Sequence, residues 1–431
     1  MRRLILPALL AYGLIFWALI AFRGEVLALI IPLVLTVGVA LFFGPEQPRL
    51  SASRTLSEDR VGEGREVRVV CTVTNNGARL EDVWLEDQIP PGLELIEGDA
   101  AQLTTLGTGQ SVELAYVVRG GRGSYEFPGV HVRAVDHFGL VEATAEVEAE
   151  GDGTLYILPR VQRLRAIAIR PRQTRVFAGS IPARVGGAGV EFFGVREYHP
   201  ADPMRHINWH ANARHPGALF STEYQQERIA DVGLILDARQ RTNIRSAGRA
   251  LFERGVLAAA ALADEFLSGG NRVGLLLYGR SLDWTVPGYG KVQRERILRA
   301  LSRAEPGDSQ VFDRLRYLPT RFFPARSQLV LISPLVYDDL EFLVRLRGQG
   351  YELLVVSPNP ISFELAGLPM TLAAHWGARI AAIERALLFQ RLRQAGVRLV
   401  DWDVDQPLDQ AIAASLARQP VWTHLLQGVG S

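Results

Sequence analysis

Two long apolar runs lie close together at the start of this 431-residue chain. Residues 4–22 and 26–43 each approach the roughly 20 apolar residues that cross a bilayer as a helix. Only Arg23, Gly24 and Glu25 separate them. Because so short a connection makes two neighbouring helices antiparallel, the sequence predicts a transmembrane helical hairpin over residues 1–44.

Basic residues flank this predicted hairpin unequally. Arg2 and Arg3 precede the first run and three arginines follow the second before residue 61, whereas Arg23 stands alone in the turn. Basic flanks stay in the cytoplasm. We therefore expect an inner-membrane protein with two transmembrane helices and cytoplasmic soluble domains. A cleaved signal peptide is the alternative for the first run, since a basic start before an apolar stretch is also typical of one.

Composition excludes several classes of protein. A chain of this length divides into two or three domains, and its formal charge of +1 gives no sign of a polyanionic partner. The single cysteine, Cys71, rules out an intrachain disulfide and paired-cysteine zinc motifs. No basic patch interleaved with aromatic residues is present, so we expect no nucleic-acid partner.

Residues 45–150 alternate between apolar and polar side chains. Val67, Val69, Cys71 and Val73 share one face of a predicted strand, and residues 112–118 repeat the pattern. Turn sequences rich in glycine, proline and asparagine separate such strands. This domain is expected to be an antiparallel, immunoglobulin-like β-sandwich.

Residues 230–410 change to continuous apolar runs that alternate with helical stretches. Runs that are apolar on both faces are typical of buried strands in a mostly parallel sheet, and strand–helix alternation predicts a doubly wound α/β domain. The expected strands are 232–236, 273–278, 329–332, 352–356 and 397–402. We expect a helical tail over residues 411–431.

A connecting segment, residues 151–229, contains an unusual density of charged, aromatic and histidine side chains. Its most distinctive residues are Arg196, Glu197, Tyr198, Asp202, Arg205, Ile207, Trp209, Ala213 and Arg214. In this pattern the chain resembles the bacterial domain-of-unknown-function-58 family, in which such a signature precedes a von Willebrand factor A-like domain. Ala201 departs from the family, which often has glycine before the aspartate.

The resemblance implies a site at the end of the first α/β strand. In von Willebrand A domains an aspartate opens an Asp-x-Ser-x-Ser loop that binds a divalent cation; here Asp237 is followed by Arg239 and Arg241. Of the other ligand positions only the hydroxyl of Ser309 remains. An arginine offers a cation no lone pair and keeps its charge, so we expect no metal and no cofactor, and expect Asp237 to pair with an arginine.

A histidine cluster raises a different possibility. His206 and His210 are spaced to share one helix face, and His215 follows. A metal-dependent hydrolase is thus an alternative function, although the glutamate of an H-E-x-x-H motif is missing.

The signature segment itself allows two interpretations. Its arginines Arg196, Arg205 and Arg214 can fork onto carboxylates, and Trp209 and Tyr198 can cover a sheet edge. The candidate carboxylates are Glu197, Asp202 and Glu227. The result is either a polar clamp between domains or a surface that recognises a partner.

Taken together, the sequence predicts a membrane-anchored, non-enzymatic tethering protein without catalytic residues. The two apolar runs predict contact with the lipid bilayer, and the family resemblance implies that the chain acts with a MoxR-type AAA+ ATPase, with a transglutaminase-like membrane protein as a further partner. Assembly or maturation of envelope or other complexes is the implied role. A metal-dependent adhesion module is the remaining alternative.

Overall fold

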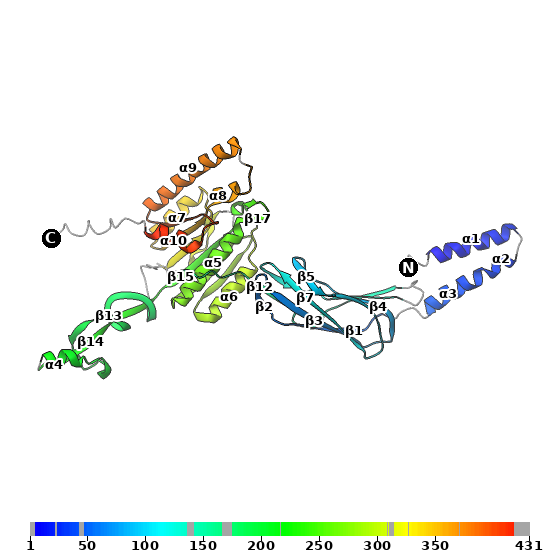
Figure 1. Cartoon of the computed structure of the whole chain (residues 1–431), viewed down its shortest axis with the longest axis horizontal. Coiled ribbons are helices and arrows are strands. Elements are labelled where there is room, and N and C mark those ends of the chain that lie inside the picture. Colours follow the sequence, from blue (N-terminus) through cyan, green and yellow to red (C-terminus); the bar gives the residue numbers. More distant parts are fainter. Residues whose placement is uncertain are drawn as a thin grey trace. The chain divides into compact units, whose positions relative to one another are not determined.

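The computed structural model describes residues 5–21, 24–42, 47–135, 142–165, 175–215, 217–307, 309, 314–325, 327–369 and 371–417 (Figure 1). The chain divides into two compact units, Met1–Leu158 and Pro159–Ser431.

The N-terminal apolar runs form shorter helices than the sequence predicted. The first is α1, Ile5–Ala21, with 17 residues; the second is divided into α2, Glu25–Ala28, and α3, Ile30–Phe42, with 13 residues. Pro32 explains the division. Its backbone nitrogen has no hydrogen to donate to the carbonyl four residues back, and its ring clashes with that carbonyl, so proline is tolerated only in the first turn of a helix. At 1.5 Å per residue, α1 and α3 are about 25 and 20 Å long.

Among the described residues no helix is both long and apolar enough to cross a bilayer. A bilayer core is about 30 Å thick, and each helix falls short of it. The predicted transmembrane hairpin over residues 1–44 is therefore wrong, and so is the predicted inner-membrane localisation with two spans.

The rest of the first unit is a β-sandwich of the immunoglobulin-like kind that the sequence predicted. One sheet has the strand order β11-β1-β3-β7-β5 and the other β10-β9-β4-β6, with a small third sheet β2-β12-β8. The strands are β1 Leu50–Leu56, β2 Arg60–Gly62, β3 Glu66–Asn75, β4 Leu80–Asp87, β5 Leu93–Gly98, β6 Ala101–Leu106, β7 Ser111–Gly120, β8 Gly123–Glu126, β9 Val130–Val135, β10 Glu142–Val147, β11 Ala149–Gly151 and β12 Thr154–Leu158. Alternate side chains of β3 and β4 are buried, which places the core between the two larger sheets.

A buried ion pair crosses this core. Arg54 from β1 donates Nε and Nη2 to the two carboxylate oxygens of Asp87 from β4, and the Tyr116 hydroxyl donates to Asp87 Oδ2 at 2.7 Å. Both charged side chains are fully buried, and the Arg54 guanidinium lies 4.8 Å from the centre of the Phe127 ring. A buried charge needs a partner, so Arg54 and Asp87 depend on each other.

The second unit begins with a long irregular hairpin. Strand β13, Arg175–Glu197, pairs antiparallel with β14, Phe220–Ile229, through several shifts of register. A 3-10 turn, η2 (Met204–His206), and the short helix α4 (Trp209–Arg214) lie between the two strands. The register shifts lie between Val176 and Gly194, where extra residues interrupt the two-residue alternation of a strand.

The α/β domain that follows contains one six-stranded sheet with the order β19-β18-β15-β20-β21-β22. Its strands are β15 Asp231–Ala238, β18 Arg272–Gly279, β19 Leu282–Gly288, β20 Gln328–Ile332, β21 Glu352–Pro358 and β22 Arg398–Trp402. All five predicted strands are confirmed, and their pairings are parallel. Strand β19 was not predicted; it folds back antiparallel on β18.

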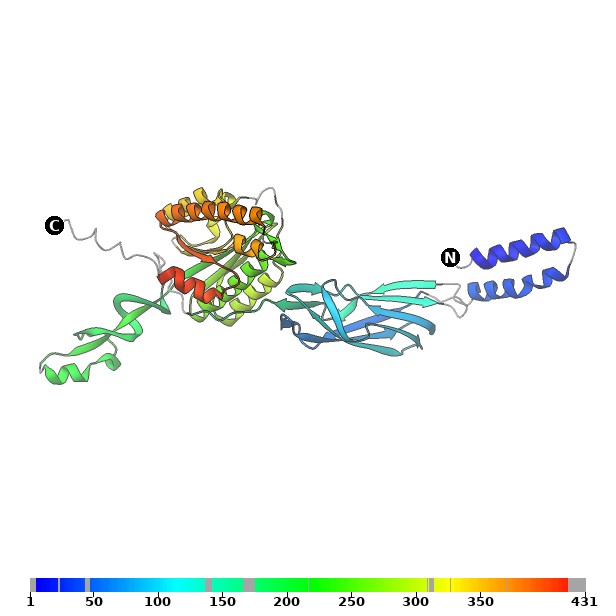
Figure 2. The ribbon, with the colours of Figure 1, turned by 45° about the horizontal axis from the view of Figure 1, so that its top comes forward.

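Helices cover both faces of this sheet (Figures 1 and 2). They are α5 Leu251–Ser268, α6 Gly290–Ser302, α7 Asp339–Gly348, α8 Pro360–Leu365, α9 Leu372–Gln394 and α10 Leu408–Ala417; residues 418–431 of the predicted helical tail lie outside the described residues. The short elements are β16 Arg245–Ser246, β17 Arg249–Ala250, η3 Gln240–Thr242, η4 Leu315–Tyr317 and η5 Thr320–Phe322.

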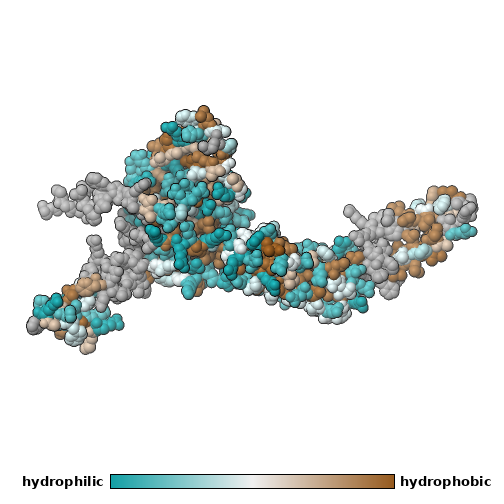
Figure 3. Space-filling model, viewed as in Figure 1, coloured by the Kyte–Doolittle hydropathy of each residue, from teal (hydrophilic) through white to brown (hydrophobic). Residues whose placement is uncertain are grey.

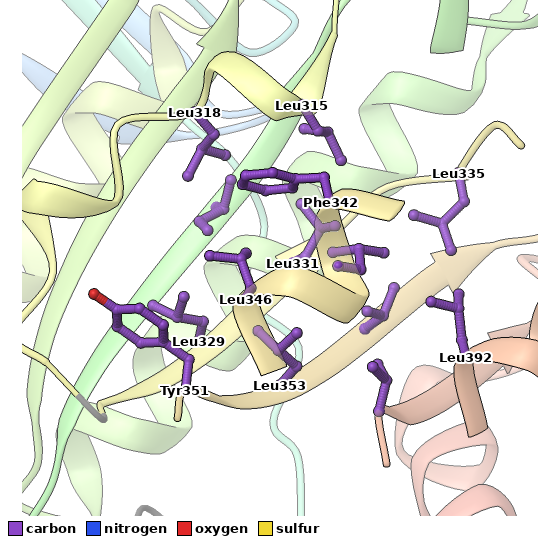
Figure 4. Close-up of a cluster of buried hydrophobic side chains, with 14 of the residues drawn as sticks. Leu315, Leu318, Leu329, Leu331, Leu335, Phe342, Leu346, Tyr351, Leu353 and Leu392 are labelled. Carbon is purple, nitrogen blue, oxygen red and sulfur yellow. The ribbon is translucent and has the colours of Figure 1, made fainter. Parts of the chain in front are cut away.

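One large cluster of buried apolar side chains lies between the sheet and helices α7 and α9. Phe342 and Leu346 of α7 meet Leu392 of α9 and alternate side chains of the strands, such as Leu331 and Leu353 (Figure 4). On the other face α5 approaches so closely that a Cβ on Gly255 would lie 3.2 Å from Leu236. Two buried faces explain why these strands are apolar without alternation.

Candidate functional site

The candidate site lies at the carboxyl edge of the sheet, where the strand order reverses. From β15 the chain moves to β18 and β19 on one side, and it later returns to β20 on the other side of β15. In open parallel sheets a crevice forms at such a point, beyond the ends of the two strands. Asp237 stands there, near the end of β15.

The guanidinium group of Arg239 fills this crevice. It donates Nε to Asp237 Oδ1 at 2.8 Å and Nη2 to Asp237 Oδ2 at 2.7 Å. It also donates Nη1 to Asp339 Oδ1 at 3.0 Å and Nη2 to Asp339 Oδ2 at 2.9 Å. All three side chains are buried. Asp237 thus pairs with an arginine, as expected from the sequence.

Neighbouring groups complete the hydrogen bonds of the two carboxylates. The Ser333 hydroxyl, just after β20, donates to Asp237 Oδ2 at 2.6 Å, and its oxygen accepts from the Leu335 backbone N–H. The N–H of Val336 donates to Asp339 Oδ2 at 3.0 Å. Leu335 has a φ of 63°, a left-handed conformation that costs a branched side chain energy. The turn that carries Ser333 is therefore held in place by its surroundings.

Burial and the neighbouring charges shift the pKa values of Arg239 and Asp339. Burial alone would lower the pKa of Arg239, but the hydrogen bonds and charges of Asp237 and Asp339 outweigh it and raise that pKa. Burial raises the pKa of Asp339 against the opposing effect of Arg239, and the Asp237 charge adds to the rise. One buried guanidinium thus serves two buried carboxylates. Arg241 supplies a second positive charge, 3.8 Å from Asp339 Oδ1.

These contacts leave no place for a divalent ion at Asp237. A carboxylate offers about four acceptor positions, and Asp237 already receives four bonds, from Arg239 N, Arg239 Nε, Arg239 Nη2 and Ser333 Oγ. Magnesium needs about six oxygen ligands, so the donor set does not fit it. In the described part of the chain no group of three or more His, Cys, Asp or Glu side chains could hold a metal ion.

Ser309 follows Gly307 by two residues, and residues 308 and 310–313 lie outside the described part of the chain. Gly307 forms a bridge with Arg239, and its N–H donates to the Ala238 carbonyl at 2.9 Å, so the loop runs beside the end of β15. The space beneath Asp237, lined by Leu236, Ile332 and other side chains, is only about 10 Å³. A cavity of that size is smaller than a small-molecule pocket.

A second arginine covers the adjacent strand ends. Arg385 of α9 donates to the Pro334 carbonyl at 2.8 Å, to the hydroxyl and carbonyl of Ser357, and to Asp401 Oδ1 at 2.9 Å. Its guanidinium also lies 4.4 Å from the centre of the Phe389 ring. Burial lowers the pKa of Arg385, while Asp401 opposes the change. Arginines therefore hold the carboxyl ends of four neighbouring strands together.

The signature segment contains a separate ion pair, at the end of β13. Arg196 donates Nη1 and Nη2 to the two oxygens of Asp202 at 2.9 and 2.6 Å, and its Nε lies 3.4 Å from Glu223 Oε1. The backbone N–H of His199 donates to Asp202 Oδ2. These bonds lower the pKa of Asp202, with the Arg196 hydrogen bond as the largest cause. Of the predicted pairs, Arg196 with Asp202 is thus present.

The other predicted residues of this segment do not converge. Trp209 is 71% exposed, so it does not cover a sheet edge. Tyr198 is half-buried, and its hydroxyl donates to the Asp202 carbonyl. No ion pair of the described residues involves Arg205 or Arg214. The side chain of Glu227 lies outside the described residues, as do those of its neighbours in β14.

The histidine cluster does not form on one helix face. His206 ends the turn η2 and His210 belongs to the next helix, α4, which begins only after Asn208 caps it by accepting from the Ala211 N–H. The helical spacing assumed for His206 and His210 is therefore wrong, because the chain is not helical between them. His215 instead lies with its ring 5.6 Å from the Phe220 ring.

Sequence reasoning missed two members of the site. Neither Ser333 nor Asp339 was among the residues that the sequence predicted for it. Yet Asp339 opens helix α7 directly after the β20 turn. The pair of aspartates at 338 and 339 was the available signal, because acidic residues in the first turn of a helix are typical of its N-terminus.

Fold and site together define a class: an α/β domain whose switch-point crevice is closed by an arginine, preceded by a β-hairpin that carries the signature residues. Residues 194–367 match the sequence model of the family described as "Protein of unknown function DUF58". This part of the chain is similar to that family.

A similar region is found in a known protein. The "Uncharacterized protein YeaD" of Bacillus subtilis (strain 168) is 28% identical over 255 residues, which make up 58% of this chain and 61% of that protein. The chain therefore spans less than two thirds of this relative's length.

Two solved structures resemble a quarter of the chain. The CARDB domain of the PF1109 protein from Pyrococcus furiosus is 18% identical, covers 24% of this chain and 90% of that one, and has a TM-score of 0.17. A non-cellulosomal cohesin from Archaeoglobus fulgidus is 15% identical, covers 25% and 91%, and has a TM-score of 0.18. Scores this low carry no argument about function.

Proposed function

We propose that this chain is a non-enzymatic protein-interaction protein that works with a MoxR-type AAA+ ATPase in the assembly or maturation of protein complexes. In this proposal its α/β domain is von Willebrand factor A-like, but an arginine replaces the cation. The ATPase would supply the energy, and this chain would present or tether the client, with a transglutaminase-like protein as a further partner.

One observation supports the non-enzymatic part of the proposal most directly. The Arg239 guanidinium occupies the switch-point crevice, where open α/β sheets bind ligands, and its four side-chain hydrogen bonds engage Asp237 and Asp339. Carboxylates that are saturated by an internal cation are not available as a general base or as metal ligands. The residues that a catalytic α/β domain would present are therefore used to hold the domain together.

The partnership is tested with purified proteins. Size-exclusion chromatography with light scattering, on the full chain mixed with the MoxR-type ATPase in the presence of ATP, ADP or no nucleotide, is expected to show a joint complex in at least one state. Separate elution in all three states would contradict the proposed partnership.

The state of the crevice is tested by thermal unfolding with 5 mM Mg²⁺ or Mn²⁺ and with a chelator. A ligand that binds only the folded chain raises its stability by mass action. Because Asp237 has no free acceptor position, we expect the same midpoint in all three conditions. A metal-dependent rise that disappears in Asp237→Ala would show that a cation displaces Arg239, and this part of the proposal would then fail.

A further inference from the structure

The end of the β13–β14 hairpin, residues 198–219, is called the hairpin tip here. It exposes three large apolar side chains: Met204 is 80% exposed, Trp209 71% and Leu219 53%. Figure 3 shows apolar and hydrophilic residues mixed around α4 at this end of the hairpin. Tryptophan and methionine are enriched in protein interfaces relative to the rest of a protein surface.

Polar bonds, and not apolar packing, give the hairpin tip its shape. Neither η2 nor α4 contains a buried residue. Asn208 caps α4 and donates Nδ2 to Thr222 Oγ1 at 3.1 Å, and the side chain of Asn212 accepts from the Phe220 N–H at 2.6 Å. The indole of Trp209 is therefore not needed to fold the tip, yet it is displayed on a framework that is already ordered.

The charges of the hairpin tip are unbalanced. Its one acid, Asp202, is engaged by Arg196 and by the His199 N–H. Two exposed arginines remain: Arg205 donates Nε to Nε2 of the neighbouring His206 at 3.4 Å, and neither Arg205 nor Arg214 takes part in an ion pair among the described residues. Four of the eight histidines of the chain also lie here. The tip thus presents positive charge around an apolar side chain.

We infer that the hairpin tip is the docking surface for a protein partner whose own surface has an acidic rim around an apolar pocket that receives Trp209. Tryptophan and arginine dominate the binding energy of protein interfaces, and methionine is enriched in them. An anionic membrane is the less suitable partner, because attraction to lipid headgroups is typical of clusters of four to eight basic residues. The inference rests on the proposed function, in which this partner is the MoxR-type ATPase.

Biolayer interferometry with the full chain immobilised and the purified ATPase in solution tests the inference. Trp209→Ala is expected to weaken binding at least about tenfold, since loss of a central aromatic side chain costs an interface that much or more. Arg214→Glu is expected to weaken it by a similar factor, and its effect is expected to shrink in 0.5 M NaCl because salt screens exposed charges.

Trp376→Ala is the matched control, because Trp376 on α9 is also exposed, at 52%. Its binding is expected to equal that of the wild type. Circular dichroism of Trp209→Ala is expected to be unchanged, since the indole is not part of a core.

The possible results are distinguishable. If the wild type does not bind the ATPase, the proposed partnership and this inference both fail. If the wild type binds the ATPase, and Trp209→Ala and Arg214→Glu each bind it equally well, the docking surface lies elsewhere and only this inference is overturned. Co-sedimentation with phosphatidylglycerol vesicles that is lost in the two tip variants, while ATPase binding persists, would replace the protein partner with lipid.

Discussion

Arg239 and Asp237, two residues apart in the chain, form a two-pronged ion pair in which Nε and Nη2 meet the two carboxylate oxygens at 2.8 and 2.7 Å. The same guanidinium reaches Asp339, which is 100 positions further along the chain. The pair therefore joins the end of β15 to the start of α7 and closes the crevice between them.

Removing the guanidinium should destabilise the α/β domain strongly. Arg239→Met keeps most of the side-chain volume but leaves two buried carboxylates without their cation. Breaking one side of a buried ion pair costs about 3–5 kcal/mol, and urea denaturation followed by circular dichroism measures the loss.

The control for this variant is Arg345→Met, because the ion pair of Arg345 with Glu341 is an exposed i,i+4 pair. Such pairs contribute about 0.5 kcal/mol or less. Equal stability of Arg239→Met and Arg345→Met would mean that the buried cluster does not hold the domain.

Asp339 should give the α/β domain an unusual pH dependence. Burial raises the pKa of Asp339 above its ordinary value, so the folded chain binds more protons than the unfolded chain between the two pKa values. The stability contributed is complete below the unfolded pKa, near pH 4, and is lost as pH rises through the folded pKa. Each unit of pKa shift corresponds to about 1.4 kcal/mol.

The measurement compares the wild type with Asp339→Asn by urea denaturation at pH 4, 5, 6 and 7. The wild-type free energy of unfolding minus that of Asp339→Asn is expected to fall as pH rises. Groups common to both proteins cancel in this difference. A difference that grows with pH would show that Arg239, and not burial, controls the titration of Asp339.

The sandwich should depend on Asp87 as the α/β domain depends on Arg239. Asp87→Ala leaves Arg54 buried without a partner and is expected to cost about 3–5 kcal/mol. Tyr116→Phe removes one hydrogen bond to Asp87 and should cost about 1–2 kcal/mol. The double change Arg54→Met with Asp87→Leu is expected to recover most of the loss, because it removes both charges together.

Cys71 reports on this region directly. Burial, with a contribution from the Asp87 charge, raises the pKa of its thiol to about 12, so the native thiol should react with Ellman's reagent only when the sandwich opens. The control is Arg119→Met, which breaks an exposed ion pair with Glu94 and should leave the labelling rate of Cys71 unchanged. Fast labelling of Cys71 in the wild type would contradict a closed core.

The short β16–β17 hairpin offers a stabilising change. Ala247 and Gly248 connect the paired residues Ser246 and Arg249, and both have positive φ, 49° and 74°. Two such residues make a type I′ turn, for which Asn-Gly is preferred. Ala247→Asn should therefore raise the free energy of unfolding by about 0.5–1 kcal/mol, measured by urea denaturation. Ala247→Val should lower the free energy of unfolding, because a β-branched residue tolerates a positive φ less well than alanine does.

The sequence predicted the elements better than their contacts. The continuous apolar strands 232–236 and 329–332 appear as β15 and β20 because burial on both faces leaves a local pattern. Strand β19 was missed because a half-exposed edge strand has no such pattern. The N-terminal prediction was wrong because counting apolar residues does not show where Pro32 divides the second helix.

By itself, the sequence determined that no serine follows Asp237 at the usual spacing, and that a permanently charged arginine takes that place. Only the tertiary structure decided which partners this arginine would have. Asp339 and Ser333 reach Asp237 through the order of strands in the sheet, which places β20 beside β15 across about a hundred residues of chain. Such an order follows from how whole layers bury their apolar faces, and no local pattern of residues contains it.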